Sequence, residues 1–467
     1  MQKHADTYQK AQEELKSRRF SAARQLFLEA ASLQGLDLPS LITQAQRLLD
    51  GGDIKAALQL YLQIFEHNPT DIDALLGLTK GALFLHQLED ANAYLSALFA
   101  MDPQHPQALT LRGLLAEANG QLEDALADLS LAVSLTPSSF LAVYNLGRLQ
   151  FDTGNVELAM ETLSDALEIS QDSSDVFYLL GLCFARSGKS DDAIAHFEKA
   201  TTILQDDADL WMTLGEFYCD VYRFDDAIVA FDKSLSLCQA AAPLLERACA
   251  ACARFGLFDA AVGYIEQLLE AQPDGFRMLL NASLFYVMTG DFDESEACLQ
   301  RAMEIKPHHW EPGFLMGNLY RSIELYDEAE EWYRVSVSHA KRPIQEFQAL
   351  GNLAVTLMEK QAMWDEEGLG DEQESVMEEA VTLLERVVKL APPKEYRFHY
   401  NLALAYASLD RSRKAGAVLE HILKDVPPSS ELFELAGDVR KHILSKVPSL
   451  RARQKRRIKR GVGGSGA

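Results

Sequence analysis

The residues with the clearest capacity for chemistry are two cysteines, Cys249 and Cys252, separated by two residues. This C-x-x-C spacing occurs in thiol–disulfide redox motifs and in one half of a zinc site. A redox motif, however, requires a strand followed by a helix around the pair, and a zinc site requires further ligands. The elements that position the two thiols therefore decide which chemistry is available to them.

Other candidate sites in the sequence are weaker. His308 and His309 stand beside Pro307 without the spacing of a metal site, and no strand precedes the glycine-rich segment 461–467, so it cannot cradle phosphate. No pair of carboxylates stands out from the many acidic residues. We therefore predict a protein that is not an enzyme and has no cofactor and no metal ion.

Composition sets the broad class of the protein. The chain has 467 residues, of which 48% are hydrophobic, so it can bury a core. No stretch approaches the run of about 18 apolar residues that spans a bilayer. The start, MQKHADTYQKAQEELKSRR, lacks the apolar centre of a signal peptide. Six cysteines in so long a chain are not a disulfide framework, and we expect reduced thiols in a cytoplasmic protein.

The main feature of the sequence is an internal repeat. Three stretches beginning at Ser174, Ala208 and Ala242 align without a gap, which defines a step of 34 residues. The same step, with one insertion before the last repeat, places the other repeat starts at His4, Leu38, Ile72, Pro106, Phe140, Phe276, Trp310, Ile344 and Tyr396. The alignment thus predicts twelve repeats.

Single columns of this alignment show what each repeat is. The twentieth position is alanine in eleven repeats and serine in one, and the twenty-fourth is always large and apolar. A small and a large side chain four residues apart lie on one helix face, which predicts a close helix crossing. The fifteenth position is glycine in six repeats and the thirty-second is proline in seven. Each repeat therefore reads as helix, tight turn, helix and stop.

This pattern resembles the tetratricopeptide repeat family, whose first helix reads W-x-x-L-G-x-x-Y and whose second reads A-x-x-x-F. The repeat that matches best has Trp211, Leu214, Gly215, Tyr218, Ala227 and Phe231. The resemblance implies an all-α, right-handed superhelical solenoid of antiparallel helix pairs. The array would span residues 4–428, with a capping helix at 429–446 and a flexible tail at 447–467.

The repeat also explains the two cysteines. Cys249 and Cys252 occupy the eighth and eleventh positions of the eighth repeat, which are inward positions of the first helix. Free cysteine packs as a small hydrophobe, and two inward positions on a helix recur three residues apart. We therefore interpret the pair as part of the core.

In the family that the pattern resembles, positions 2, 5, 9 and 12 of each repeat face a concave groove. The side chains that this assignment predicts as a protein-binding groove are Tyr144, Arg148, Phe151, Tyr178, Met212, Glu216, Glu246, Phe314, Asn318, Arg321, Asn352, Arg397 and Tyr400. Aromatic anchors with a few charges suit a peptide-binding surface, although some of the aromatics are expected only to pack on neighbouring helices.

Two segments depart from the repeat. About 17 extra residues, acidic and containing Trp364, form an insertion around 360–378. The tail carries a basic run that consists of Arg451, Arg453, Lys455, Arg456, Arg457, Lys459 and Arg460, although the formal net charge of the whole chain is −25. This run is attracted to anionic surfaces, and nucleic acid, a membrane or the chain's own acidic insertion are all candidates.

The sequence thus predicts a cytoplasmic scaffold or adaptor whose groove binds protein partners. Two alternatives remain: a chaperone-type module that holds an exported or unfolded client, and a non-catalytic targeting subunit for a separately encoded transferase. An RNA-binding helical repeat would need a basic groove, and the acidic body argues against nucleic acid there.

Overall fold

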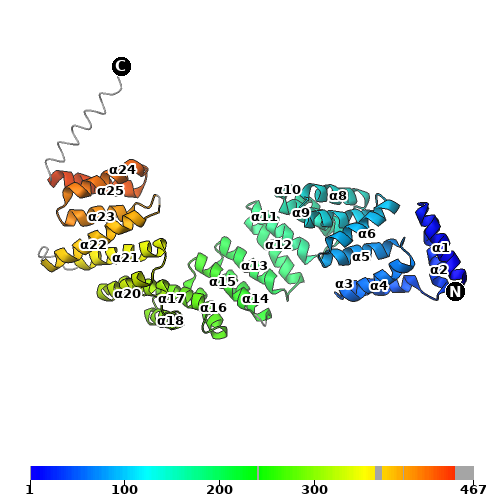
Figure 1. Cartoon of the computed structure of the whole chain (residues 1–467), viewed down its shortest axis with the longest axis horizontal. Coiled ribbons are helices and arrows are strands. Elements are labelled where there is room, and N and C mark those ends of the chain that lie inside the picture. The colour runs from blue at the N-terminus through cyan, green and yellow to red at the C-terminus, as the bar shows by residue number, and fades with distance from the viewer. Residues whose placement is uncertain (1, 239–240, 363–370, 393, 447–467) are drawn as a thin grey trace, which may run out of the picture. The chain divides into compact units, whose positions relative to one another are not determined.

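The computed structural model describes residues 2–238, 241–362, 371–392 and 394–446. Every regular element in these residues is an α-helix, and the chain forms two compact units (Figure 1). We call residues 1–238 the N-terminal part and residues 239–467 the C-terminal part, and we describe each by itself.

The helices of the N-terminal part are α1 (Gln2–Lys16), α2 (Phe20–Leu33), α3 (Leu38–Asp50), α4 (Ile54–His67), α5 (Ile72–Phe84), α6 (Leu88–Met101), α7 (Pro106–Ala118), α8 (Leu122–Leu135), α9 (Phe140–Asp152), α10 (Val156–Ile169), α11 (Ser174–Arg186), α12 (Ser190–Ile203), α13 (Ala208–Asp220) and α14 (Phe224–Leu237). The helices of the C-terminal part are α15 (Ala242–Arg254), α16 (Phe258–Ala271), α17 (Phe276–Thr289), α18 (Phe292–Ile305), α19 (Trp310–Ser322), α20 (Tyr326–His339), α21 (Pro343–Ala362), α22 (Asp371–Leu390), α23 (Arg397–Ser408), α24 (Ser412–Asp425) and α25 (Glu431–Lys446).

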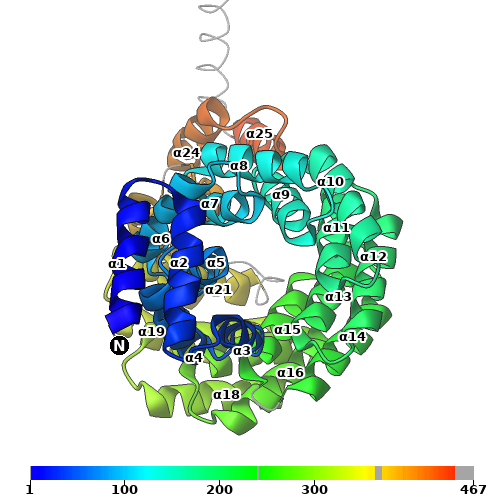
Figure 2. The ribbon, with the colours of Figure 1, turned by 90° about the vertical axis from the view of Figure 1, so that its right-hand side faces the viewer.

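The helices follow the 34-residue register. From α3 to α19, each first helix of a pair begins at the residue where the alignment starts a repeat. Within each part, most helices pack on the next, and first helices of successive repeats also touch, as α5 does with α7 and α17 with α19. In the N-terminal part, α9 and α11 lie on the inner side of their partners α10 and α12 (Figure 2). The fold is an all-α solenoid of helix pairs, as predicted.

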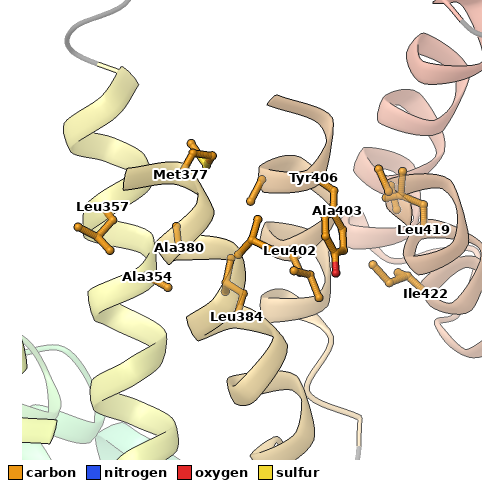
Figure 3. Packing of buried hydrophobic residues seen from close by; sticks show 14 of the residues in the cluster. Ala354, Leu357, Met377, Ala380, Leu384, Leu402, Ala403, Tyr406, Leu419 and Ile422 are labelled. Carbon is orange, nitrogen blue, oxygen red and sulfur yellow. The ribbon is translucent and has the colours of Figure 1, made fainter. Parts of the chain in front are cut away.

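The core is built from the two columns that the alignment singled out. All twelve side chains at the twentieth position are completely buried, and those at the twenty-fourth position are at most 2% exposed. The large side chain packs on a residue that must be small, at the eighth position of the same repeat. At Gly215, for example, a Cβ atom would lie 2.5 Å from the ring of Phe231. Figure 3 shows the same layering in the last repeats, where Ala380 and Leu384 of α22 lie between α21 and α23.

The turn between the two helices of a repeat has the same left-handed residue in every repeat except the eleventh. The residue at the fifteenth position has a positive φ in all six repeats that carry glycine there, and also in five that do not. The five exceptions are Arg18, His86, Tyr222, Glu324 and Asp410. The left-handed conformation is strained for residues with a Cβ atom, so packing of the helix pair imposes it.

We therefore expect Glu324→Gly to stabilise the C-terminal part by about 0.5–1 kcal/mol, because glycine relieves the left-handed strain. Gly290→Ala should do the reverse and cost about 1 kcal/mol. A Cβ atom at Gly290 would meet no other atom within 4 Å, so its cost comes from φ (92°) alone. Urea denaturation followed by circular dichroism measures the change in the free energy of unfolding for each substitution. If both substitutions changed it in the same direction, left-handed strain would not explain the turn.

The insertion changes two helices of the eleventh repeat. Helices α21 and α22 are each 20 residues long, whereas most first and second helices have 13 and 14 residues. Most of the inserted residues thus lengthen helices, because Met358 replaces the turn residue and strong helix formers follow it. Trp364 lies outside the described residues.

Candidate protein-binding face

The predicted groove residues lie on the first helices, and we call the surface formed by positions 2, 5, 9 and 12 of these helices the inner face. These positions recur with the period of a helix, so they lie on one side of it. Side chains at these positions contact the first helix of the next repeat in both parts of the chain, as described below. Where these contacts occur, the inner face extends from one repeat to the next.

In the N-terminal part the inner face carries aromatic side chains. Tyr144 and Phe151 of α9 and Tyr178 of α11 are half-buried and pack against one core cluster. Arg186 covers this cluster: its guanidinium lies 4.3 Å from the centre of the Phe151 ring and donates a hydrogen bond of 3.0 Å to the Phe151 carbonyl. The arrangement offers flat aromatic area beside a cation, which suits a peptide side chain.

Arg148 belongs to an ion pair between repeats. Its guanidinium donates two hydrogen bonds to Glu117 of α7, at 2.8 and 2.6 Å, and a third to Asp152 at 3.1 Å. Hydrogen bonding to Glu117 raises the pKa of Arg148, so the cation is held firmly. The side chains of Arg148 and Glu117 are only 26% and 24% exposed. Arg148 therefore stabilises the stacking of two repeats.

In the C-terminal part four predicted residues converge on one buried tyrosine. Tyr333 is fully buried and donates a 2.6 Å hydrogen bond to Oδ1 of Asn318. The same oxygen accepts a 2.8 Å hydrogen bond from Nδ2 of Asn352, one repeat further on. The Phe314 ring lies 6.0 Å from the Tyr333 ring, measured between centres. Arg321 pairs with Glu359 at 2.8 Å.

The other predicted residues are dispersed. Glu246 is exposed and Glu216 is half-buried. Arg397, whose side chain is 81% exposed, pairs with Glu395 at 3.1 Å, and Tyr400 packs against the last core cluster. The basic residues of the tail lie outside the described residues.

One prediction is corrected by the structure. Met212 was assigned to the groove from its place at the fifth position, but its side chain is completely buried. The long, flexible thioether side chain folds into the core at this position, so it is not available to a ligand.

Sequence reasoning also missed the partners that hold the predicted residues. Glu117 and Arg186 lie on first helices, and their positions in the helical period could have revealed them. Tyr333 is at the twenty-fourth position and was assigned only to the core. Glu359 lies in the lengthened part of α21, where the repeat offers no position to compare.

The two cysteines have the surroundings of core residues. Cys249 and Cys252 are buried, and burial raises the pKa of Cys249 to about 11. The Cys249 thiol lies 3.7 Å from the carbonyl oxygen of Ala261, so it occupies the place where other repeats have glycine. A thiol with so high a pKa is a poor nucleophile at neutral pH. Among the described residues, no three His, Cys, Asp or Glu side chains are grouped to hold a metal ion.

Comparison with known families assigns the fold. Three sequence profiles, each described as tetratricopeptide repeat, match the chain. The first matches residues 116–183, the second matches residues 80–140, 253–309 and 377–430, and the third matches residues 174–206. Together these ranges span about half of the chain. The chain belongs to the tetratricopeptide repeat family. Arrays of such repeats are in general protein-interaction modules without catalytic activity, and they present extended concave binding surfaces.

Solved structures of similar fold include three tetratricopeptide repeat or related proteins. One is titled as a functional characterisation of pilF from Pseudomonas aeruginosa, with 20% identity, a TM-score of 0.38 and coverage of 46% of this chain and 96% of that one. TTC0263 from Thermus thermophilus has 22% identity, a TM-score of 0.35 and coverage of 41% and 100%. YrrB, described as having an unusual peptide-binding site, has 20% identity, a TM-score of 0.29 and coverage of 38% and 91%.

A comparison with curated protein sequences finds no match. None of the described helices combines the length and the apolar character that crossing a membrane requires.

Proposed function

We propose that the chain is a non-catalytic scaffold or adaptor that binds peptide segments of partner proteins along its inner face. The proposed compartment is the cytoplasm, and its support is that all six cysteines are free thiols. The proposal needs no cofactor and no metal ion.

The observation that carries the proposal is the asparagine pair of α19 and α21. Oδ1 of Asn318 already accepts two hydrogen bonds, from Tyr333 and from Asn352. Within the described residues, this leaves Nδ2 of Asn318 as a donor and Oδ1 of Asn352 as an acceptor, side by side. A peptide group also presents one donor and one acceptor, so an extended segment can bind both. The Tyr333 contact fixes the orientation of the pair in advance, which lowers the entropic cost of binding.

Apolar side chains lie beside this pair and on the neighbouring first helix. Phe314 is half-buried beside it, and the exposed side chains of Leu284 and Met288 lie on the neighbouring first helix, α17. Recognition of an extended peptide has two components. Polar groups form hydrogen bonds with the peptide backbone, and apolar side chains pack against alternate side chains of the peptide. The aromatic cluster of the N-terminal part supplies a second surface of the same chemistry.

We expect Asn352→Ala to weaken binding of a cognate peptide about three- to tenfold, the contribution of one neutral hydrogen bond. Peptides selected from a random library by the full chain are the probe, and isothermal titration measures their dissociation constants. Nδ2 of Asn352 donates to Asn318 and, at 3.5 Å, to the hydroxyl of Tyr333. Tyr333 keeps its shorter hydrogen bond to Asn318 when Asn352 is replaced, so the fold should persist. Asn281→Ala, which changes an exposed asparagine on α17, is the matched control and should leave the affinity unchanged.

Two results would count against the proposal. One is the failure of the full chain to select any peptide. The other is that every selected peptide binds Asn352→Ala and Phe314→Ala as tightly as it binds the unchanged chain, which would place the interaction away from the inner face.

A further inference from the structure

The C-terminal part contains a cavity that the regular repeats do not build. It has a volume of about 640 Å³, within the range of ligand-binding pockets. Its walls come from α21, α22, α23 and α25, and they are largely apolar. The wall residues that matter here are Met358, Met377, Leu404, Val439 and Ile443. Met377 and Ile443 are buried, so the cavity reaches into the core shown in Figure 3.

The insertion creates one wall of this cavity. In an ordinary repeat the chain turns at the fifteenth position, but here that position is Met358, and α21 continues to Ala362. The side chains of Met358 and Gln361 thus stand where other repeats have a turn, and both line the cavity. Two unbranched methionines, Met358 and Met377, can adapt to the shape of an inserted apolar side chain.

Ion pairs hold the lengthened helices in place. Lys360 of α21 pairs with Asp327 and, at 3.0 Å, with Glu330, both on α20. On the other side, Arg411, which directly precedes α24, pairs with Glu378 of α22. These ion pairs therefore hold α21 and α22, which form two walls of the cavity, against their neighbouring helices.

The rim of the cavity is acidic. Asp410 and Asp438 both line it and are both exposed. Asp438 also pairs with Lys441 at 2.7 Å, but these side chains are 64% and 81% exposed, and an ion pair so exposed exchanges readily. An occupant with an apolar side chain followed by cations would match both the interior and the rim.

The chain itself contains such a segment directly after α25. The sequence V-P-S-L-R-A-R follows Lys446, so Leu450 comes seven residues after the wall residue Ile443. The helix α25 ends at Lys446, so four residues lead from its end to Leu450, and four residues span up to about 14 Å. Pro448 is incompatible with a continued helix, which allows the chain to reverse. Arg451 and Arg453 follow Leu450 and are the cations that the rim requires.

We propose that the tail docks in this cavity, with Leu450 inserted between Met358 and Met377 and with Arg451 and Arg453 at Asp410 and Asp438. Because the tail is tethered beside the cavity, docking is intramolecular and the effective concentration is high. Docking holds the remaining basic residues, 455–460, at a defined end of the array. This inference does not depend on the proposed peptide binding at Asn318 and Asn352.

Disulfide trapping in the full chain tests the docking. Ser408, which lines the cavity, and Ser449, which precedes Leu450, are both changed to cysteine, and the cross-link is followed over time by peptide mapping. The cross-link is expected within one chain. Adding Leu450→Asp should slow its formation about tenfold, because a charged side chain cannot replace a buried leucine. Ile458→Asp is the matched control, since it places the same change in the same tail beyond the docked segment, and it should leave the rate unchanged.

Three results would contradict docking of the tail within one chain. Equal rates with and without Leu450→Asp would overturn the proposal. A rate that falls equally with Ile458→Asp would also overturn it, because general charge attraction would then explain the contact. A cross-link found between two chains, seen as a covalent dimer, would show that a second copy supplies the tail and would likewise exclude docking within one chain. Both aspartate substitutions lie in the tail and the Ser408→Cys change is common to every arm, so a difference in rate between the arms does not come from the fold of the repeats.

Discussion

Replacing Phe231 by alanine is expected to lower the free energy of unfolding of the N-terminal part by about 3–5 kcal/mol. The ring is completely buried and lies directly on the backbone of Gly215, which has no side chain to fill the space left behind. Ala227, at the twentieth position, is also completely buried, and it is too small to fill the space. Guanidinium denaturation of the full chain, followed by circular dichroism, measures the change.

Phe84→Ala is the matched control for this experiment. Phe84 belongs to the same part of the chain, but 72% of its surface is exposed. The same chemical change there should alter stability by no more than about 0.5 kcal/mol. Equal losses from the two substitutions would show that the twenty-fourth position does not carry the packing of the repeat.

Reversing the charge of Arg148 is expected to have the second largest effect. Removal of one partner from a fully buried ion pair costs about 3–5 kcal/mol. About a quarter of each side chain is exposed here, which reduces the cost, whereas Arg148→Glu adds repulsion from Glu117 and Asp152. We therefore expect a loss of about 2–4 kcal/mol in the N-terminal part, measured by the same denaturation.

A charge swap distinguishes this ion pair from a general effect of charge. The double variant Arg148→Glu with Glu117→Arg restores an attractive pair and should recover part of the lost stability. Arg19→Glu is the surface control, because Arg19 is 69% exposed and pairs with Glu14 at 3.3 Å, and it should cost no more than about 1 kcal/mol. If the double variant is less stable than Arg148→Glu alone, the two side chains do not interact as described.

The sequence by itself determined the repeat, the helix boundaries and the core. These features are local: a column of alanine, a column of large residues and a turn residue recur every 34 residues, and each has a physical effect within its own repeat. The helices from α3 to α19 accordingly begin where the alignment predicts, and both columns are buried. The resemblance to the tetratricopeptide repeat family rests on the same local pattern.

Only the tertiary structure decided what the inner-face residues do. The helical period places Arg148, Met212 and Asn318 on the same side of their helices, yet one is held in an ion pair, one is buried and one belongs to an asparagine pair. These outcomes depend on side chains of neighbouring repeats, 34 or more residues away in some cases. The cavity beside α25 likewise depends on how far α21 and α22 continue and on which helices face them. A periodic sequence defines each repeat, but it does not define the contacts between unlike side chains where two repeats meet.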